Sequence, residues 1–415
     1  MFSVVAVKRS ALILCDNVRD RGNYVPCRYF GEGLARRGWE ITIVAVGRRN
    51  LIMPTKSSEN GVSVIETPYL LRRLLRMLIF PRLLVKGTGN AGFDLMDVVY
   101  RIYYTLALKY DILYVCEYFP NTYLPALVAR KFRHCAIVAE RLDQYVDGGL
   151  FDVFRIPWFK YKWLRWAERN QLQRIDGLVA ISTHLAKRAT EMGFDENRIR
   201  VIHGGVAVES VRPIDRGLSR TRLGIPHSNN IMVFLGAGHT DLDLLRTIVE
   251  RLQPEILKNA QLVLVGEITR RSRLMKRALR GVIDTLLTGR IADGELSVYL
   301  SAADVAVLPL SDSTFNRSRW PNKIGEYLAA GCAVVVCDVG DVARFVRETG
   351  SGLVVKSANE FAQAIKTLIE DAALRKSVSI NARKAAEDHL DWSKQTETLE
   401  RFLDECRRPI HAETL

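Results

Sequence analysis

The stretch DSTFNRSRWPNKIGEYLAAGCAVVVCD, residues 312–338, predicts a polar loop, a helix and a buried strand in succession. Residues 312–320 are polar and rich in turn-forming residues. Residues 321–330 have a proline in the first helical turn and apolar residues at helical spacing, and Gly331 is the kind of residue that commonly ends a helix. Residues 333–337 form an unbroken apolar run rich in valine, which is typical of a strand buried on both faces in a parallel sheet.

One cation and one carboxylate lie in the first turns of this predicted helix. Lys323 and Glu326 are three residues apart, so they share a helix face. A cation beside the free amides of a helix start favours phosphate, and a carboxylate one turn on can accept hydrogen bonds from two hydroxyls of a ribose. The pair predicts a nucleotide-diphosphate site, and the alternative is an ordinary i,i+3 ion pair on an amphipathic helix.

Strand-like and helix-like segments alternate along the whole chain. The alternation runs from residue 4 to residue 203, pauses in a polar stretch at residues 213–230, and then begins again. It predicts an α/β fold with parallel, doubly wound sheets, which bind ligands at the carboxyl ends of their strands. A chain of 415 residues accommodates two such domains. We expect a first domain at residues 1–212, a second at 213–390, and a helix at 391–415 that packs back on the first domain.

The composition is ordinary for a globular protein, with 48% hydrophobic and 26% charged residues. No run approaches the roughly 20 apolar residues that a membrane-spanning helix needs. The apolar run at residues 11–15, after Lys8 and Arg9, is too short for a signal peptide and predicts a buried strand. The seven cysteines show neither zinc-site nor disulfide spacing, so we expect reduced thiols and a cytoplasmic protein.

Positive charge is concentrated in the first half of the chain. Residues 1–212 carry 32 Lys and Arg against 20 Asp and Glu, a net charge of +12, whereas the remaining residues carry 28 against 26. A surface of one sign favours an anionic partner, either a membrane or a nucleic acid. No nucleic-acid-binding module is visible, so we expect no nucleic acid as the main partner.

Residues 321–331, PNKIGEYLAAG, resemble the nucleotide-sugar signature of the bacterial group 1 transferases, and the order of elements resembles that of the GT-B glycosyltransferases. The resemblance implies two Rossmann-like domains that face each other across a cleft, with the donor in the second domain. It implies that Lys323 contacts the donor diphosphate and that Glu326 holds the ribose. The other positions that we assign to donor binding on this basis are Asn322, Gly205, and Gly236, Gly238 and His239 in the turn after the first strand of the second domain.

The chain also departs from the family pattern at two places. Many retaining members carry a second glutamate eight residues before the one that corresponds to Glu326. In this chain that position is Ser318. The turn at residues 236–240 lacks the Arg and Lys that relatives often carry, although its glycines still allow backbone amides to approach a phosphate. The missing acid favours an inverting reaction.

In the first domain, residues 14–23 (LCDNVRDRGN) and 139–143 (AERLD) resemble the membrane-associated glucuronosyltransferases of xanthan assembly. The resemblance implies that Asp143 is the general base that removes the proton of the acceptor hydroxyl. The alternative is a helix cap or a surface charge. Glu117, at the end of another strand, is expected to orient the acceptor or Asp143, or else to be a solvated loop charge. The acceptor loop includes Arg19, Arg21 and Asn23.

Two basic stretches of the first domain fit an interfacial membrane contact. Residues 70–86, from Leu70 to Lys86, mix leucines with arginines, and residues 154–169, from Phe154 to Arg169, interleave tryptophans with lysines. The alternative for each is a core-facing helix with a solvated basic face. We expect a peripheral protein on the inner face of the plasma membrane.

These features predict a glycosyltransferase that moves a hexosyl or glycuronosyl group from a nucleotide-diphosphate sugar, UDP-linked, to a lipid-linked saccharide or polysaccharide precursor. We expect no cofactor and no metal ion, because the single DxD, Asp241 and Asp243, lies at a helix start where N-terminal capping is expected. Two alternatives remain: a sugar-nucleotide epimerase of the same fold, and an inactive scaffold docked on the membrane. The sequence leaves open the sugar, the acceptor, the linkage, the anomeric outcome and the oligomeric state.

Overall fold

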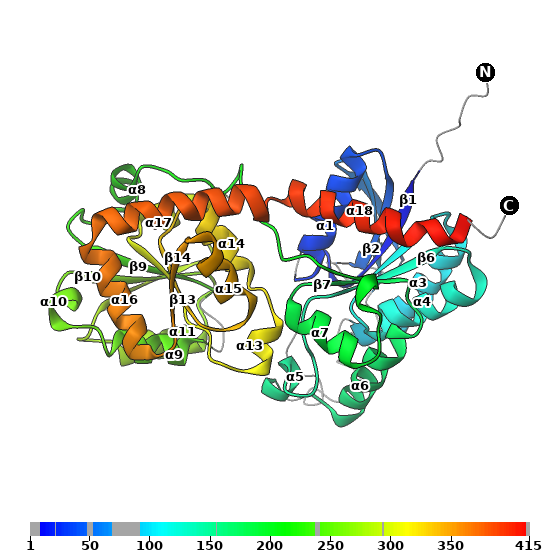
Figure 1. Ribbon diagram of the computed structural model, residues 1–415, viewed down its shortest axis with the longest axis horizontal. Coiled ribbons are helices and arrows are strands. Elements are labelled where there is room, and N and C mark those ends of the chain that lie inside the picture. Colours follow the sequence, from blue (N-terminus) through cyan, green and yellow to red (C-terminus); the bar gives the residue numbers. More distant parts are fainter. Residues whose placement is uncertain are drawn as a thin grey trace, which may run out of the picture. The chain divides into compact units, whose positions relative to one another are not determined.

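The computed structural model describes residues 9–20, 22–47, 53–68, 92–154, 156–236, 241–292 and 294–411 (Figure 1). The chain divides into two compact units, Met1–His203 with Gln395–Leu415, and Gly204–Lys394. Each unit is an α/β domain built on a sheet of parallel strands flanked by helices, which confirms the prediction of two Rossmann-like domains. The expected membrane stretch at residues 70–86 lies outside the described residues.

The sheet of the first unit has eight strands in the order β3-β4-β2-β1-β5-β6-β7-β8, and all neighbours are parallel except β3 and β4. The central strands are buried, apart from the two end residues of β1, because helices cover both faces of their largely apolar sequences. The strands are β1 (Ser10–Val18), β2 (Glu40–Val46), β3 (Thr55–Glu59), β4 (Val62–Thr67), β5 (Ile112–Cys116), β6 (Ala136–Arg141), β7 (Gly177–Ala180) and β8 (Ile199–Val201).

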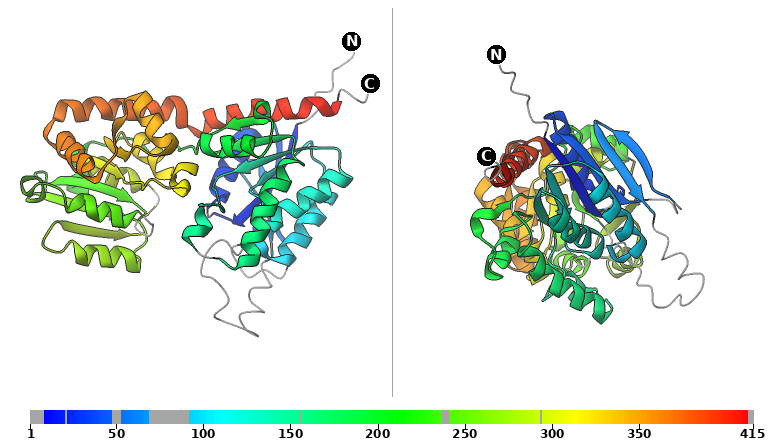
Figure 2. Two further views of the ribbon diagram at one scale, coloured as in Figure 1. Left: turned by 60° about the horizontal axis from the view of Figure 1, so that its bottom comes forward. Right: turned by 90° about the vertical axis from the view of Figure 1, so that its right-hand side faces the viewer.

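Helices follow most of these strands, and one helix returns from the end of the chain. Trp39 donates a hydrogen bond to Glu400 at 2.9 Å, and Arg9 pairs with Asp404 at 2.9 Å, so α18 packs beside β1 and α1 (Figure 2). The helices of this unit are α1 (Tyr24–Arg36), α3 (Leu95–Ala107), α4 (Pro120–Phe132), α5 (Leu150–Val153), α6 (Trp158–Leu172), α7 (Thr183–Glu191), the short η2 (Glu196–Arg198) and α18 (Trp392–His411).

The sheet of the second unit has six parallel strands in the order β11-β10-β9-β12-β13-β14. Its strands are β9 (Asn230–Leu235), β10 (Ala260–Val265), β11 (Asp284–Gly289), β12 (Val305–Leu308), β13 (Val334–Cys337) and β14 (Gly352–Val355). Its helices are α8 (Arg216–Leu223), α9 (Leu242–Val249), α10 (Pro254–Leu257), α11 (Arg270–Ala278), α12 (Leu296–Ala302), α13 (Thr314–Ser318), α14 (Asn322–Ala329), α15 (Gly340–Thr349), α16 (Ala358–Glu370), α17 (Ala372–Ala385) and the π-helical η3 (Ala386–Leu390).

Three details of this architecture differ from the sequence prediction. The first sheet has an antiparallel edge strand, β3, whose residues are all exposed. The predicted loop at 312–320 contains α13, which Ser313 caps, and the predicted connection at 213–230 contains α8, which Asp215 caps. In both cases the capping side chain accepts a hydrogen bond from a first-turn amide, which lets a polar stretch form a short helix.

All seven cysteines are free thiols, and six of them are buried, which agrees with the predicted reduced core. Within the described residues, no helix combines the length and the apolar character that crossing a membrane requires.

Candidate active site

The second sheet has a topological switch point between β9 and β12. From β9 the chain continues outward to β10 and β11, whereas β12 leads to β13 and β14 on the other side, so the strand order reverses here. Open α/β sheets bind ligands at the carboxyl ends of strands at such a point. Tyr327 of α14 links the two strands: its hydroxyl accepts a hydrogen bond from the Leu235 amide at 2.8 Å and donates to the Val307 carbonyl at 3.4 Å.

Lys323 lies at this edge, with its ammonium nitrogen 4.2 Å from the centre of the Phe234 ring. The nitrogen is buried and has no hydrogen-bond partner among the described residues. Burial lowers the pKa of Lys323 to about 8, and this shift is opposed by the charge of Asp241 and increased by that of Arg319. A buried cation with unused donors is costly unless an anion binds to it, so Lys323 is suited to a phosphate.

Arg319 is a second cation at this edge, and the sequence assigned it no role. It pairs with Asp241 at 3.0 Å and stacks over Phe315, with 4.4 Å from the guanidinium carbon to the ring centre. Its Nε is buried and unpaired in the described part of the chain. The only available signal was its place in the loop that leads to Lys323. The two cations together make this edge suited to an anion.

Asp241 is buried in this ion pair and makes no side-chain hydrogen bond to the start of α9. The expectation that it caps the helix is therefore wrong. The carboxylate instead holds the guanidinium of Arg319 in place, since a buried charge requires a partner.

Glu326 lies one turn after Lys323 on α14 and is half-buried. Burial raises the pKa of Glu326, and the charge of Lys323 opposes the shift. The two side chains form no ion pair with each other, which was the alternative interpretation of their spacing. The carboxylate oxygens therefore remain available as acceptors beside the anion site.

The other residues assigned to donor binding are distributed around this edge. Gly236 ends β9 with a φ of 84°, a conformation that favours glycine. Gly238 and His239 lie outside the described residues, and their roles stay predictions. Asn322 is exposed, and a Cβ at Gly204 would lie 3.0 Å from its Oδ1. A Cβ at Gly205 would lie 2.5 Å from the Trp392 ring, so this glycine is required where the indole packs.

Ser318, which stands where relatives carry an acid, is buried and donates a hydrogen bond to the Phe315 carbonyl at 2.9 Å. This contact keeps the hydroxyl within α13. The side chain therefore has a structural role in the loop before Lys323.

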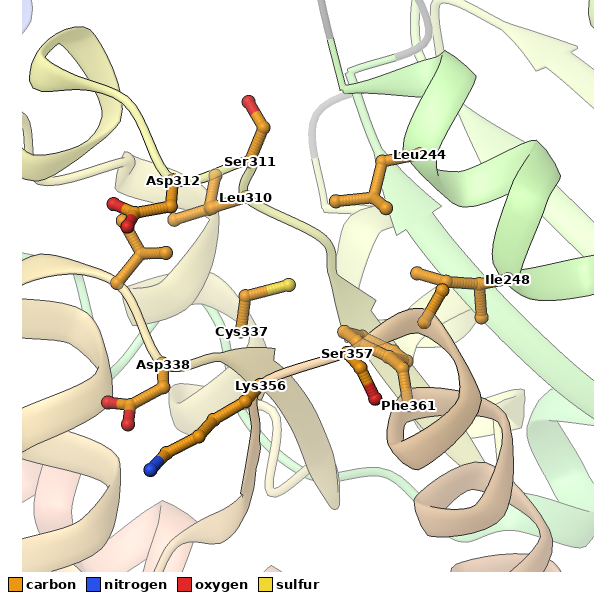
Figure 3. Close-up of a pocket in the computed structure, with 12 residues that line it drawn as sticks. Leu244, Ile248, Leu310, Ser311, Asp312, Cys337, Asp338, Lys356, Ser357 and Phe361 are labelled. Atoms are coloured by element: carbon orange, nitrogen blue, oxygen red, sulfur yellow. The ribbon is translucent and has the colours of Figure 1, made fainter.

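A cavity of about 460 Å³ opens at the carboxyl ends of β12, β13 and β14 (Figure 3). One wall is apolar, and the rim carries Asp312 and Asp338, which pair with Arg317 at 2.6 Å and with Arg347 at 2.8 Å. Neither Lys323 nor Glu326 lines it, so it is not the anion site itself. The lining side chains include Leu244 and Ile248 of α9, Phe361 of α16, Cys337 and Lys356.

In the first unit, Glu117 is completely buried directly after β5, so the interpretation as a solvated loop charge is wrong. Its φ of 63° is unusual for a residue with a side chain. Its Oε1 accepts hydrogen bonds from the amides of Leu142 at 2.8 Å and Asp143 at 3.2 Å. Burial raises the pKa of Glu117 well above its ordinary value, and the charges of Asp16 and Asp143 act in the same direction. Glu117 therefore fixes the backbone that carries Asp143.

Asp16 brings a third carboxyl to the same edge of the first sheet, because β1, β5 and β6 are neighbours. Burial raises the pKa of Asp16 to about 6, and a hydrogen bond from Asn23 opposes the shift. Asn23 donates this bond at 3.0 Å. Arg19 instead pairs with Glu59 and Glu66 on the edge strands, and Arg21 lies outside the described residues.

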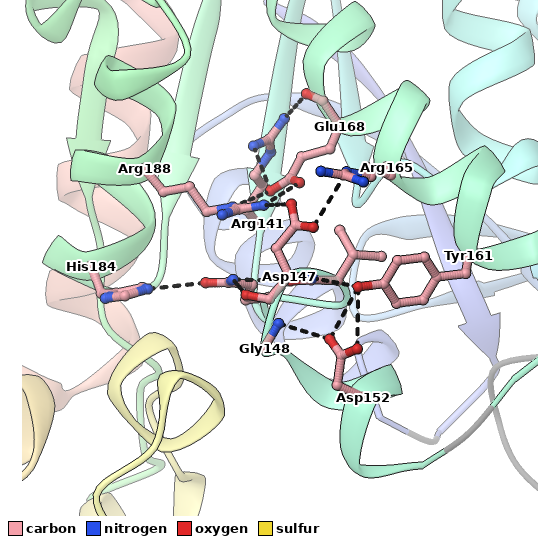
Figure 4. A network of polar contacts seen from close by, with 11 residues as sticks. Arg141, Asp147, Gly148, Asp152, Tyr161, Arg165, Glu168, His184 and Arg188 are labelled. Atoms are coloured by element: carbon pink, nitrogen blue, oxygen red, sulfur yellow. Dashed lines mark hydrogen bonds and ion pairs between the residues drawn. The ribbon is translucent and has the colours of Figure 1, made fainter.

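The loop from Asp143 to Gly149 is fixed by a polar network (Figure 4). Arg188 bonds to Asp147 and to Glu168, each at 2.8 Å. Gln144 donates to the carbonyl of Asp147 at 2.8 Å, and its Oε1 lies 3.0 Å from Nε2 of His184. These contacts hold the half-buried Asp143 in a defined position before any ligand binds, which is the arrangement that a catalytic group needs.

Helix α6 presents three of its aromatic side chains to solvent, whereas Tyr161 and Trp163 pack against the core. Trp158 is 69% exposed, Phe159 55% and Trp166 47%, while Leu164 and Ala167 form the buried face. Lys162 lies over the Trp158 ring at 4.9 Å. The helix has the core-facing side of the alternative interpretation, and its solvated face carries exposed rings as well as basic side chains, so the membrane contact stays a prediction.

Two family models match the chain. The model described as "Glycosyl transferases group 1" matches residues 229–371, in the second unit, and the "Glycosyl transferase 4-like domain" matches residues 25–205. The two matches cover the second sheet and every strand of the first sheet except β1.

Curated relatives are distant in sequence. A D-inositol 3-phosphate glycosyltransferase of Nocardioides sp. is 27% identical over 241 residues, 53% of this chain and 51% of that protein. An uncharacterized glycosyltransferase of Methanocaldococcus jannaschii is 23% identical over 391 residues, 89% of this chain and 91% of that protein. The chain matches about half the length of the D-inositol 3-phosphate enzymes.

Solved structures show the same fold over nearly the whole chain. A sucrose-phosphate synthase from Thermosynechococcus elongatus has a TM-score of 0.71 at 17% identity, with coverage of 97% of this chain and 100% of that one. Anabaena HepE in complex with UDP and glucose has a TM-score of 0.65 at 14% identity, with coverage of 96% and 100%.

Proposed function

Since the chain is a GT-B glycosyltransferase that resembles the bacterial group 1 transferases, we propose that it transfers a sugar from a UDP-linked donor to a lipid-linked saccharide. The observation that carries the proposal is the pair of cations, Lys323 and Arg319, each half-buried with one buried, unpaired nitrogen, at the strand edge where open α/β sheets bind nucleotides.

The donor roles follow from charge. Lys323 and Arg319 neutralise the diphosphate and stabilise the negative charge that develops on it as the bond to the sugar breaks. Glu326 accepts hydrogen bonds from the ribose hydroxyls. Because two side-chain cations supply this stabilisation, the proposal includes neither a metal ion nor a cofactor. The choice of UDP is supported by the UDP in the HepE structure.

Asp143 is the proposed general base. The acceptor hydroxyl oxygen forms a bond to the anomeric carbon, the bond from that carbon to the diphosphate oxygen breaks, and the hydroxyl proton passes to Asp143. UDP leaves with the electron pair. Direct attack from the face opposite the leaving group gives inversion, and the serine at position 318 in place of an acid supports this outcome.

The proposed acceptor is carried by a membrane, and the exposed rings and lysines of α6 support this choice. Aromatic and basic side chains on one helix are typical of an interfacial contact. The corresponding location is peripheral, on the cytoplasmic face of the plasma membrane, and the product is a polysaccharide precursor.

The test combines binding and turnover. UDP and a panel of UDP-sugars are first compared for protection against thermal unfolding, because a ligand of the native state raises apparent stability. The UDP-sugar that protects best is then incubated with a membrane extract, and NMR determines the anomeric configuration of the product. Asp143→Asn should lower turnover by about 10²- to 10⁴-fold with unchanged UDP protection. Full turnover by a folded Asp143→Asn protein would show that Asp143 is not the general base.

Two outcomes would replace the proposal. Binding of UDP-sugar without transfer or hydrolysis would point to a scaffold. Conversion of one UDP-sugar into its epimer without an acceptor would point to an epimerase.

A further inference from the structure

Six cations lie on and directly after helix α11 of the second unit, with no acidic residue between them. All six side chains are exposed, and none pairs with an acid in the described part of the chain. The small net charge of the second half of the sequence conceals this local concentration. The six are Arg270, Arg271, Arg273, Lys276, Arg277 and Arg280.

These cations gather on the outer face of α11. The buried side chains Ser272, Met275 and Leu279 mark the inner face, which packs beside α9 and β11 (Figure 1). Arg270, Arg273 and Arg277 are three and four residues apart, so they form a row on the outer face. The first turn of α11 follows the loop after the carboxyl end of β10, at the edge of the sheet that also carries Lys323.

The position of the arginines opposes helix stability. Arg270, Arg271 and Arg273 lie in the first turn or directly after it, where the positive end of the helix dipole disfavours cations. The helix begins with a capping box between Thr269 and Ser272, which satisfies its first amides without these arginines. Helix stability therefore does not explain these three arginines, whereas binding of an anionic surface does.

An exposed apolar side chain in the row of arginines favours a lipid bilayer over a nucleic acid as the anionic partner. Leu274, between Arg273 and Arg277, is 50% exposed, and Ile268 just before the helix is 39% exposed. Residues 266–281 contain no aromatic side chain on which a base could stack. A basic helix with an exposed leucine is typical of contact with anionic lipids.

We propose that the outer face of α11 binds the headgroups of an anionic lipid bilayer. This contact belongs to the donor-binding unit and is independent of α6 in the first unit. It rests on the charges of α11 and not on the sugar-transfer reaction. Its consequence is that the donor edge of the second unit is held close to the surface of the bilayer.

The test is flotation of the full chain with vesicles of phosphatidylcholine and phosphatidylglycerol, compared with vesicles of phosphatidylcholine alone. The variant Arg270→Glu, Arg273→Glu, Arg277→Glu should bind the anionic vesicles roughly hundredfold or more weakly, since each cation near such a surface contributes about fivefold. Its thermal stability should change little, because glutamates at positions 270 and 273 suit the start of the helix and offset the less favourable glutamate at position 277 in its last turn. UDP binding should be unchanged, which separates failure of this inference from failure of the proposed reaction.

Two matched variants complete the design. Lys258→Glu, Lys376→Glu, Lys384→Glu changes the net charge equally at exposed positions on other elements and should bind normally. Arg270→Lys, Arg273→Lys, Arg277→Lys keeps the charge and should also bind. Equal loss in both glutamate variants, or no loss in the α11 variant, would overturn the proposal. Loss of binding to single- or double-stranded DNA alone, with vesicle binding intact, would overturn it in favour of a nucleic acid.

Discussion

Lys323 and Phe234 are in direct contact, with the ammonium nitrogen 4.2 Å from the centre of the ring. The ring gives the cation some electrostatic stabilisation but accepts no conventional hydrogen bond. The N–H donors of Lys323 are therefore available to a ligand, and an anionic ligand requires this nitrogen to be protonated.

UDP affinity should depend on pH through Lys323. Its pKa is about 8 in the folded protein. Burial disfavours the charged form of Lys323 and so lowers the free energy of unfolding. This destabilisation is fully present below about pH 8 and disappears as the pH rises toward the ordinary pKa of a lysine. Because UDP binds the charged form, affinity should fall about tenfold per pH unit above about pH 8. Calorimetry should show this slope for the wild type and a flat profile for Lys323→Arg. A wild-type affinity that stays constant across this range would contradict the assignment.

Arg319 should contribute to UDP binding as well as to folding. Arg319→Ala leaves Asp241 buried without its partner and should lower the free energy of unfolding by about 3–5 kcal/mol. The double variant Arg319→Gln, Asp241→Asn removes both charges and should recover most of this loss. It should still bind UDP about tenfold or more weakly, because a charge-assisted hydrogen bond is missing. Normal UDP affinity in the double variant would limit Arg319 to a structural role.

Glu326 should recognise the ribose. Glu326→Ala should weaken UDP binding by about 1.5–3 kcal/mol, the usual contribution of hydrogen bonds to a charged group. The same substitution should hardly change the affinity for 2′,3′-dideoxy-UDP, which lacks both hydroxyls. Equal losses for the two nucleotides, measured by calorimetry, would show that Glu326 acts elsewhere.

Glu117 should hold the Asp143 loop through its Oε1. Glu117→Ala leaves the amides of Leu142 and Asp143 unpaired and should cost about 2–4 kcal/mol of unfolding free energy. Glu117→Gln keeps the acceptor oxygen. Because the pKa of Glu117 is raised from 4.5, the folded wild type loses stability as the pH rises above that value. Denaturant titrations should therefore show that the free energy of unfolding of Glu117→Gln increases relative to that of the wild type as the pH rises. A difference that does not change with pH would argue against a buried carboxyl.

Helix α6 should bind membranes through its rings. Trp158→Ser, Phe159→Ser removes two exposed aromatic side chains and should lower vesicle binding by about tenfold or more, since each buried ring contributes about 1.5–3 kcal/mol. The matched control is Leu218→Ser, Ile380→Ser, two exposed apolar residues of the second unit. Flotation that responds equally to both variants would indicate a nonspecific apolar effect.

The sequence predicted the sheets well because buried strands carry their own signal. Strands β2, β9, β10, β12 and β14 each contain a run of apolar residues, which is the signal that predicted the alternation of strands and helices. Strand β3 carries no such pattern, since its sequence TKSSE is exposed throughout and it exists through pairing with β4. Edge pairing depends on a neighbour, and a single sequence does not show the neighbour.

The sequence predicted only the part of the candidate site whose residues lie close together in the chain. Lys323 and Glu326 belong to one helix, so their spacing placed them on a shared face. Arg319 meets Asp241 across 78 positions of sequence, and Glu117 bonds to a loop 25 and 26 residues later. Such contacts depend on how the strands are ordered in the sheet, which spacing along the chain does not encode.

The sharing of α18 between the two units has a consequence for biosynthesis. The second unit ends at Lys394, whereas the first unit needs Gln395 and the residues after it, among them Thr396, which packs against Gly33, and Glu400, which bonds to Trp39. During translation the whole second unit leaves the ribosome before this last piece of the first. The unit whose synthesis begins first is therefore completed last. Until residues 395–415 are synthesised, the surface of α1 that α18 covers stays exposed, and a chaperone could bind it during this time.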